Sequence, residues 1–143
     1  MESNLIAKAS VTIAASTAKV WHALTTPASI KQYMFGTEVA SDWREGSPIT
    51  WKGTWEGKPY EDKGVILQLK AERTLQYSHF SPASGLPDKP ENYHTVTIEL
   101  WSEGDATRVA LSQDRNPTSA ARDHAEGNWA RMLQGLKKVL ETK

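Results

Sequence analysis

The chain has 143 residues, with 17 Lys+Arg against 17 Asp+Glu, six Trp and no Cys. That length suits one domain, and a composition of 24% charged and 38% hydrophobic residues argues against long disorder. Because the formal net charge is zero, the composition gives no electrostatic support for nucleic-acid binding. The absence of cysteine excludes disulfides, iron–sulfur clusters, thiol nucleophiles and thiolate zinc sites.

The N-terminal residues alternate in polarity and do not form an apolar leader. Glu2 stands where a secretory signal needs positive charge, and a polar residue follows at every second position from Lys8 to Thr12. No stretch reaches the ~20 apolar residues that a membrane span requires. We therefore expect a cytoplasmic protein without a membrane span.

The first part of the chain is predicted to form a strand and two short helices. Every second residue from Ala7 to Ile13 is apolar, which is typical of a half-buried strand. Ser16 or Thr17 offers an N-cap for a helix that ends before Pro27. Pro27 can open a second short helix, because a proline in the first helical turn wastes no backbone hydrogen bond.

From about Gly36 the hydrophobic period changes to two, which predicts a run of about six strands. Residues 56–59 and 103–105 carry turn signals, and residues 81–92 hold three prolines without an apolar pattern, which indicates an exposed loop. Local hairpins between the strands favour an antiparallel sheet. The clearest apolar strand positions are Ile49–Trp55, Val65–Leu69, Leu75–His79, Val96–Leu100 and Val109–Leu111.

The C-terminal part is predicted to be one long helix. Asn116 offers the N-cap and Pro117 the first helical position. Apolar residues from Ala121 to Leu140 recur at helical spacing, and such a stripe needs a broad apolar partner, which only the sheet provides. The expected fold is α+β: a curved antiparallel sheet of six or seven strands around a long C-terminal helix, in one domain over residues 1–143.

This order of elements resembles the helix-grip fold of the START and Bet v 1-like (SRPBCC) superfamily, and most closely the branch named for the activator of heat-shock protein 90 ATPase. Val20–Thr25 (VWHALT) resembles the first-helix signature of that branch. Trp43–Ser47 occupies the place of its arginine–glycine turn, with Ser47 where a second glycine is common, and Gly127–Glu141 resembles its last-helix pattern. The resemblance implies a scaffold with a cavity, which different members use for lipids, aromatic polyketides, hormones or chaperone contact.

Large aromatic side chains are the most unusual feature of the sequence. Strand and helix periods direct most of them to the interior, although Trp101 has the phase opposite to its apolar neighbours in the strand. Indoles and phenols give an apolar wall with a few polar points, which is typical of a small-molecule pocket, and the open alternative is that they only fill the core. The predicted ligand-binding residues are Trp51, Trp55, Tyr77, His79, Trp101, Trp129, Met132, Leu133 and Leu136.

Gly127 lies inside the predicted last helix, where glycine costs about 1 kcal/mol relative to alanine. Close approach of another backbone would offset that cost, and this is the interpretation that we favour. The alternative is that Gly127 leaves room for a ligand.

The histidines and carboxylates give little support for catalysis. His22, His79, His94 and His124 have no zinc-site spacing, and the phase of His22 and His124 places both on polar helix faces. His79 shares the inner phase of Tyr77 and has the chemistry of a general base, although a hydrogen-bonded structural role is the alternative. Glu61, Asp62 and Glu99 are not placed inside by the pattern, so no paired acid and base is predicted.

We therefore expect a ligand-binding domain rather than an enzyme, holding an apolar or aromatic small molecule between the sheet and the last helix. No metal is expected, because the histidines lack zinc-site spacing, and no cofactor is expected, because the sequence has no nucleotide-binding motif. The alternatives are a chaperone-associated protein, whose well-studied relatives carry an additional N-terminal domain, and a cyclase-like or aromatase-like enzyme. The pattern leaves the ligand and the oligomeric state open.

Overall fold

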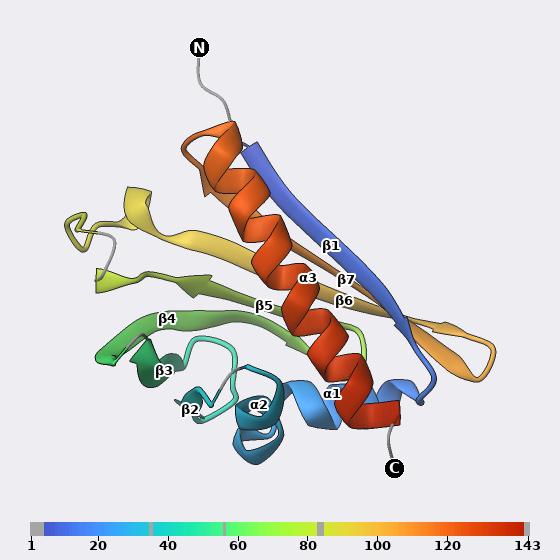
Figure 1. Ribbon diagram of the computed structural model, residues 1–143. Coiled ribbons are helices and arrows are strands. Elements are labelled where there is room, and N and C mark those ends of the chain that lie inside the picture. The colour runs from blue at the N-terminus through green and yellow to red at the C-terminus, as the bar shows by residue number, and fades with distance from the viewer. Residues whose placement is uncertain (1–4, 35, 56, 83–84, 142–143) are drawn as a thin grey trace.

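A curved antiparallel sheet lies against one long C-terminal helix, α3 (Ser119–Glu141), in the computed structural model (Figure 1). The structure describes residues 5–34, 36–55, 57–82 and 85–141, without the side chain of Trp55. The other elements are β1 (Leu5–Ile13), α1 (Thr17–Leu24), α2 (Pro27–Tyr33), β2 (Glu38–Ser41), β3 (Pro48–Trp55), β4 (Lys58–Lys70), β5 (Thr74–His79), a short 3₁₀ helix (Pro90–Asn92), β6 (His94–Glu103) and β7 (Ala106–Asn116). The seven strands within these residues follow the spatial order β1-β7-β6-β5-β4-β3-β2, which confirms the predicted fold class.

The two short helices begin where the sequence predicts. The Ser16 hydroxyl accepts a hydrogen bond of 3.2 Å from the backbone N–H of Lys19, so Ser16 is the N-cap of α1. Pro27 is the first residue of α2, and the hydroxyl of Tyr33 at its end donates to the carbonyl of Ala23 at 2.9 Å. This buried bond ties α2 to α1 beside the C-terminal half of α3 (Figure 1).

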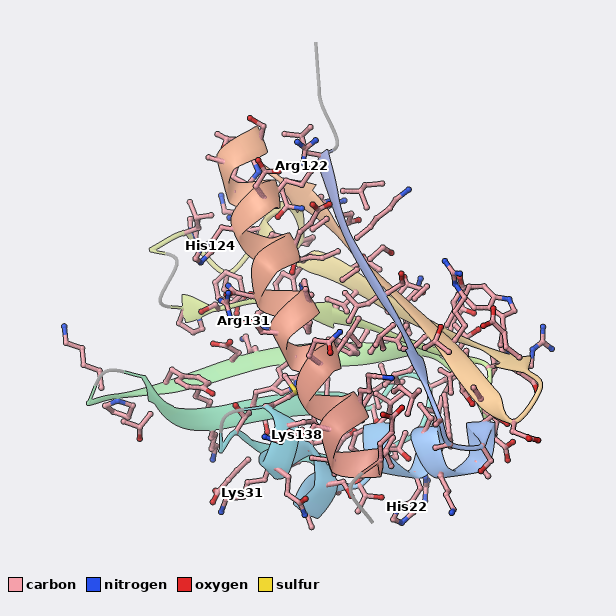
Figure 2. All side chains as sticks on the ribbon, turned by 45° about the vertical axis from the view of Figure 1, so that its right-hand side comes forward. His22, Lys31, Arg122, His124, Arg131 and Lys138 are labelled. Atoms are coloured by element: carbon pink, nitrogen blue, oxygen red, sulfur yellow. The ribbon has the colours of Figure 1, made fainter. Side chains whose placement is uncertain are left out.

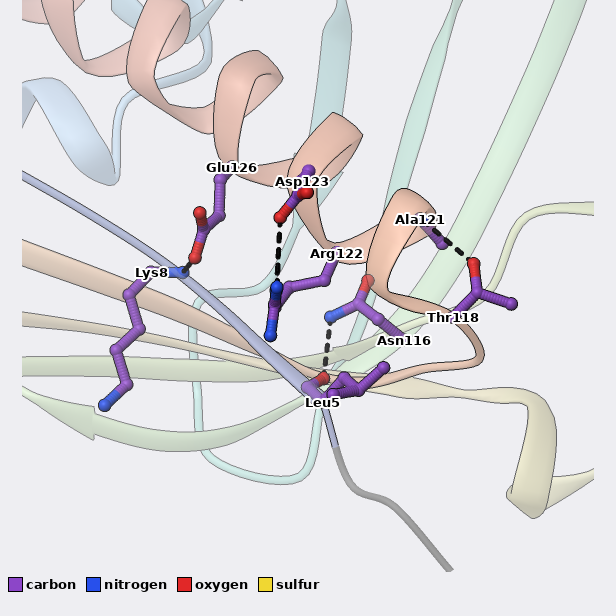
Figure 3. A network of polar contacts seen from close by, with 8 residues as sticks. All are labelled: Leu5, Lys8, Asn116, Thr118, Ala121, Arg122, Asp123 and Glu126. Atoms are coloured by element: carbon purple, nitrogen blue, oxygen red, sulfur yellow. Dashed lines mark hydrogen bonds and ion pairs between the residues drawn. The ribbon is translucent and has the colours of Figure 1, made fainter.

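The start of α3 differs from the prediction. Asn116 ends β7, where its amide group is buried and donates to the backbone carbonyls of Leu5 and Gln113 at 2.9 and 3.0 Å (Figure 3). The hydroxyl of Thr118 accepts from the N–H of Ala121 at 3.0 Å and caps the helix instead. Asn116 is therefore wrong as an N-cap, because its side chain closes the junction between β1 and β7.

The inner face of β4 also differs from the prediction. Val65 and Leu67 are 37% and 43% exposed, whereas Ile66 is fully buried. A bulge between Ile66 and Gln68 then reverses the phase, so that Leu69 lies opposite the buried Leu75 of β5. Before the bulge, every second residue counted back from the buried Ile66 faces inward. This set includes Asp62, which lies directly opposite the inward-facing Trp51.

The densest part of the core lies between the sheet, α1, α2 and the C-terminal half of α3. Leu133 and Leu136 are fully buried there, and Gly135 brings α3 close to Tyr33 of α2. The hydroxyl of Thr107 is also fully buried and donates to the carbonyl of Ala15 at 2.8 Å. A buried hydroxyl with a partner avoids the desolvation penalty of an unpaired one, so Thr107 stabilises this half of the core.

Charged side chains of α3 form hydrogen bonds with backbone groups of β1 and of Ala14, which follows it. Glu126 accepts from the N–H of Lys8 at 3.0 Å (Figure 3), and Glu141 accepts from the N–H of Ala14 at 2.7 Å. Lys137 donates to the carbonyl of Thr12 at 2.7 Å. The helix is therefore fastened along one edge of the sheet by side-chain-to-backbone hydrogen bonds as well as by apolar packing.

The opposite face of α3 is polar, as predicted. His124, Arg131 and Lys138, labelled in Figure 2, are exposed on α3, and His22 is exposed on α1. No described helix combines the length and apolarity needed to cross a membrane.

Candidate ligand-binding site

Two small cavities lie between the sheet and the helices. The larger measures about 80 Å³, and its walls come from α2, α3 and the strands β3, β4 and β5. The smaller measures about 20 Å³ and lies deeper in the core. Met34, Trp51 and Tyr77 line both cavities, so these three side chains form the partition between them. The larger cavity is lined by Met34, Thr37, Trp51, Tyr60, Asp62, Tyr77, His79 and Trp129.

Wider hollows of about 480 and 500 Å³ lie on the outside of the sheet. The first is lined by outward-facing residues such as Lys8, Glu99 and Arg108, and the second by residues that include Thr50 and Lys63. Neither contains any of the predicted ligand-binding residues. Enclosure and convergent polar groups define a ligand site better than volume, so the cavity of about 80 Å³ is the better candidate.

An acid–histidine pair forms one wall of the larger cavity. Nε2 of His79 lies 3.0 Å from Oδ2 of Asp62, and the two side chains are 28% and 16% exposed. The indole of Trp51 meets the imidazole edge-on with ring centroids 5.0 Å apart. Gly64 allows β4 to approach β5 closely at this point, because a Cβ on Gly64 would overlap the backbone carbonyl of Ser78 in β5.

The pair has unused hydrogen-bonding capacity. An ionised carboxylate only accepts hydrogen bonds, so Nε2 of His79 carries the proton that bonds to Asp62. In the neutral imidazole the lone pair is then on Nδ1, for which the described residues provide no partner. The second carboxylate oxygen, Oδ1 of Asp62, is buried and likewise has no partner among the described residues.

Tyr77 adds a protonated hydroxyl to the wall. Its ring contacts Trp51 with centroids 5.0 Å apart, and burial raises its pKa well above the usual value for tyrosine. Burial also raises the pKa of Tyr33, with a smaller contribution from the neighbouring Tyr77. Both phenols therefore remain neutral donors at any physiological pH.

The rim of the larger cavity is held by side-chain hydrogen bonds. Nε1–H of Trp129 donates to Oε1 of Gln113 on β7 at 2.7 Å, which fixes the indole of α3 over the sheet. The hydroxyls of Thr37 and Tyr60 lie 2.6 Å apart across the other side. Met34, at the end of α2, is the unbranched and flexible member of the wall.

The structure brings together four of the predicted residues, Trp51, Tyr77, His79 and Trp129. Of the predicted α3 residues, Met132 lines only the smaller cavity. Leu133 and Leu136 belong to the dense core and line neither cavity. The predicted contribution of Trp55 lies outside the described side chains.

Trp101 is wrong as a wall residue. Its side chain is 47% exposed on the outer face of β6, where it pairs across the strands with Arg108. The alternation of the strand explains this placement, because the neighbouring Leu100 is buried.

Gly127 does not serve close packing. A Cβ at this position would meet only Nη1 of Arg131, at 3.8 Å, so no other backbone approaches it. The close approach predicted for Gly127 is found instead at Gly135, where a Cβ would lie 3.4 Å from the carbonyl oxygen of Tyr33.

Several wall residues were missed from the sequence, and Asp62 matters most among them. The signal that would have found it is the inward phase of Tyr60, Asp62, Gly64 and Ile66, which the more apolar outward residues of β4 conceal. No group of three histidine, aspartate or glutamate side chains in the described ranges is arranged to bind a metal ion. His79, bonded to Asp62, can accept a proton, and Tyr77 can donate a hydrogen bond.

The sequence profile described as activator of Hsp90 ATPase homolog 1-like protein matches residues 14–141. The chain belongs to this family. Among proteins with curated descriptions, none matches the chain. The family match confirms the resemblance seen in the sequence motifs.

Solved structures show how widely this family fold is shared. The solution structure of ChR145 from Cytophaga hutchinsonii is 57% identical, with a TM-score of 0.86 over 99% of this chain and 97% of that one. The Aha1 dimer from Colwellia psychrerythraea is 22% identical, with a TM-score of 0.74 over 99% and 98%. DynU16, a protein of the dynemicin biosynthetic locus, is 16% identical, with a TM-score of 0.80 over 96% of this chain and 48% of that one. The last two likenesses show the fold alone.

Proposed function

We propose that this protein binds a small molecule with an apolar or aromatic body in the cavity between the sheet and α3. The observation that carries the proposal is the buried Oδ1 of Asp62, which lacks a partner among the described residues in a cavity walled by Trp51 and Trp129. The indoles supply apolar contact area, and the carboxylate oxygen supplies a fixed point for a hydrogen-bond donor.

The energetics of burial support a ligand role for Asp62. A buried polar group without a partner costs about 1–3 kcal/mol, and more when it is charged. A side chain in a purely structural core has no reason to keep that cost, whereas a binding site recovers it when a ligand donates to the oxygen. In contrast to Oδ1 of Asp62, the buried hydroxyl of Thr107 in the dense core has a partner, the carbonyl of Ala15.

The size of the cavity favours a small ligand. A void of about 80 Å³ is smaller than the cavity of about 150 Å³ that holds one benzene ring, so a ligand of one or two rings fits only when wall side chains move, and a long acyl chain or a sterol does not fit. Met34 separates it from the void of about 20 Å³, so a change of the Met34 rotamer would join the two and lengthen the site. We propose that Met34 adjusts to the ligand in this way.

The comparisons support the general class of function. Helix-grip proteins often bind hydrophobic ligands, and DynU16, which shares the fold, comes from a biosynthetic locus. The specific ligand of this chain is part of the proposal, and its size and donor group follow from the cavity.

Thermal unfolding with a graded series of ligands tests the proposal. At a hundredfold excess over Kd, a ligand that binds only the folded state stabilises it by about 2.7 kcal/mol, which raises Tm by about 5–10 °C. We expect this shift with one- and two-ring phenols such as 2-naphthol, whose hydroxyl can donate to Asp62, a smaller shift with ketones such as 2-tetralone, which have no donor, and none with fatty acids or sterols. Indole fluorescence should change in the same titration, because Trp51 and Trp129 line the site.

A matched pair of tryptophan substitutions provides the control. Met34→Trp fills the cavity and should abolish the shift, whereas Leu67→Trp, on the exposed face of β4, should leave it intact. Absence of a shift with every phenol and ketone in the series would refute the proposal, as would an unchanged shift in a folded Met34→Trp variant.

The family match favours a second candidate function, contact with a heat-shock protein 90 chaperone. Titrating the domain into the chaperone of its own organism and measuring ATP turnover tests this role. We expect no change at tenfold excess, because the features described above form an internal site rather than a docking surface. A saturable rise in turnover would make chaperone contact the better function. Both candidates imply a cytoplasmic protein.

A further inference from the structure

We infer that the Asp62–His79 pair makes this cavity a proton-transfer site, in which His79 removes a proton from the carbon beside a ketone carbonyl. The inference rests on the ligand site proposed above and adds a reaction to it. Three groups on the cavity wall carry it: an imidazole whose second nitrogen has no partner among the described residues, a carboxylate bound to the first nitrogen, and a phenol. The ligand class is a small aromatic ketone with an acidic C–H bond.

The pair is arranged as a general base. Because Nε2–H of His79 is held by Oδ2 of Asp62 at 3.0 Å, the imidazole is fixed in the tautomer whose free lone pair is on Nδ1. The carboxylate also stabilises the imidazolium that forms when Nδ1 takes up a proton. Asp62 is a positioning residue in this scheme, because it acts through His79.

The surroundings keep the pair both shielded and reachable. Trp51 packs edge-on against the imidazole, and the His94 ring lies 6.5 Å away across β5 and β6. Nδ1 of His94 is engaged with the carbonyl of Asp114 at 2.9 Å, so that histidine has a structural partner of its own. The partial exposure of His79 leaves a path for a ligand from solvent.

The reaction step is balanced without a co-reactant. The C–H bond beside the carbonyl breaks, its electron pair forms the C=C bond of an enolate, and the C=O π pair moves onto oxygen. The proton goes to Nδ1 of His79, while Tyr77 donates a hydrogen bond to the enolate oxygen from a hydroxyl that burial keeps protonated. Return of a proton from Nδ1 to carbon restores the ketone and the neutral imidazole.

A purely structural role for the pair does not account for its geometry. A carboxylate that only anchors a strand satisfies both oxygens in the fold, whereas Asp62 uses Oδ2, and its buried Oδ1 has no partner among the described residues. A histidine that only fills space has no need for a bonded carboxylate behind it. The combination is typical of a base that must be oriented and electrostatically supported.

Deuterium exchange of 2-tetralone tests the inference. The protein is mixed with the ketone in D₂O, and loss of the α-proton signals is followed by proton NMR, with free imidazole at the same concentration as reference. We expect exchange at least tenfold faster than the reference, and a loss of 10²-fold or more in His79→Asn. His124→Asn, which changes an exposed histidine on α3, should leave the rate unchanged (Figure 2).

Asp62 is tested by separating binding from rate. Asp62→Asn should lower the exchange rate at saturating ketone about tenfold or more, while the Kd from indole fluorescence changes less than threefold. Asp62→Glu should recover part of the rate, which a merely structural effect would not do. His79→Gln replaces His79→Asn if the latter does not melt cooperatively.

The outcomes separate this inference from the proposed function. Binding of 2-tetralone with exchange no faster than the imidazole reference, or with a rate unaffected in folded His79 variants, overturns the proton-transfer role and leaves the ligand site standing. Failure of 2-tetralone and the related phenols and ketones to bind overturns the ligand site and the inference together.

Discussion

The space beneath α3 has two halves that differ in packing and polarity. Around Leu133 and Leu136, where α1 and α2 close the end of the sheet, side chains are fully buried and the polar groups are paired. Around Trp129, where the helix faces β3, β4 and β5, there is a cavity lined by Asp62, whose buried Oδ1 has no partner among the described residues. One helix and one sheet therefore enclose both a tightly packed core and a recess with polar walls.

The C-terminal half of α3 therefore packs the core through Leu133 and Leu136, whereas the part around Trp129 covers the cavity. The dense half can carry the free energy of folding, which allows the other half to keep a void and an unpartnered buried oxygen that reduce it. The division predicts that substitutions in the two halves have different costs for stability and different effects on ligand binding.

The largest expected effect comes from opening a cavity in the dense half. Leu133→Ala should lower the free energy of unfolding by about 2–5 kcal/mol, because the site is fully buried and its neighbours cannot close the gap. Met34→Ala should cost less than that range, because Met34 is only half-buried and loses less buried area than Leu133. Urea denaturation of both variants measures the difference, and equal costs would show that the two halves are packed alike.

A pair of glycines in α3 sharpens the same contrast. Gly135→Leu should lower the free energy of unfolding by about 1–3 kcal/mol, because its side chain would press against the backbone of Tyr33. Gly127→Ala should raise it by up to about 1 kcal/mol, since the new methyl meets only the end of Arg131 and alanine favours the helix. Thermal melting of both variants is the measurement. Destabilisation by Gly127→Ala would mean that this glycine has a packing role after all.

The smallest effect concerns the fastening of the dense half to β1. The Lys137 ammonium and the N–H of Ala14 hold the pKa of Glu141 below its usual value. A carboxyl with a lowered folded pKa stabilises the protein above its unfolded pKa, and this stabilisation is lost as the pH falls through the folded value. Glu141→Gln should therefore lower Tm by roughly 1–2 °C at pH 7, as expected for exposed groups.

That difference between Glu141→Gln and the unsubstituted protein should disappear as the pH falls below the ordinary glutamate value of about 4.5. Melting curves from pH 7 to pH 3 measure it. A constant difference across that range would show that the substitution acts through packing and not through the charge of Glu141.

The sequence predicts the sheet, the two short helices and the long amphipathic helix, because their periods are strong and local. It also predicts the inward side of β3 and β5, which brings Trp51, Tyr77 and His79 together. It fails at β4, where the bulge after Ile66 reverses the phase and the exposed Val65 and Leu67 imitate a buried face. The pairing register that creates the bulge is a tertiary property, so periodicity cannot reveal it.

The same failure hid the chemistry of the site. The sequence pattern assigns Val65 and Leu67 to the buried face of β4, and this assignment places Asp62 on the exposed face. Its position opposite Trp51, and its distance from His79, depend on how β4 pairs with its two neighbours. Acid–histidine pairs from adjacent strands are therefore harder to predict than those on one helix, where fixed spacing in the sequence brings side chains together.

The hydrogen bonds from α3 to β1 have a consequence for self-association. A sheet edge with free backbone groups is a template on which another chain can add a strand, the first step towards aggregation. Glu126, Lys137 and Glu141 occupy such groups along β1, so this edge is protected by the protein's own helix. The other edge is β2, which at four residues offers little length for an incoming strand. The docked helix α3 therefore protects this edge against strand addition.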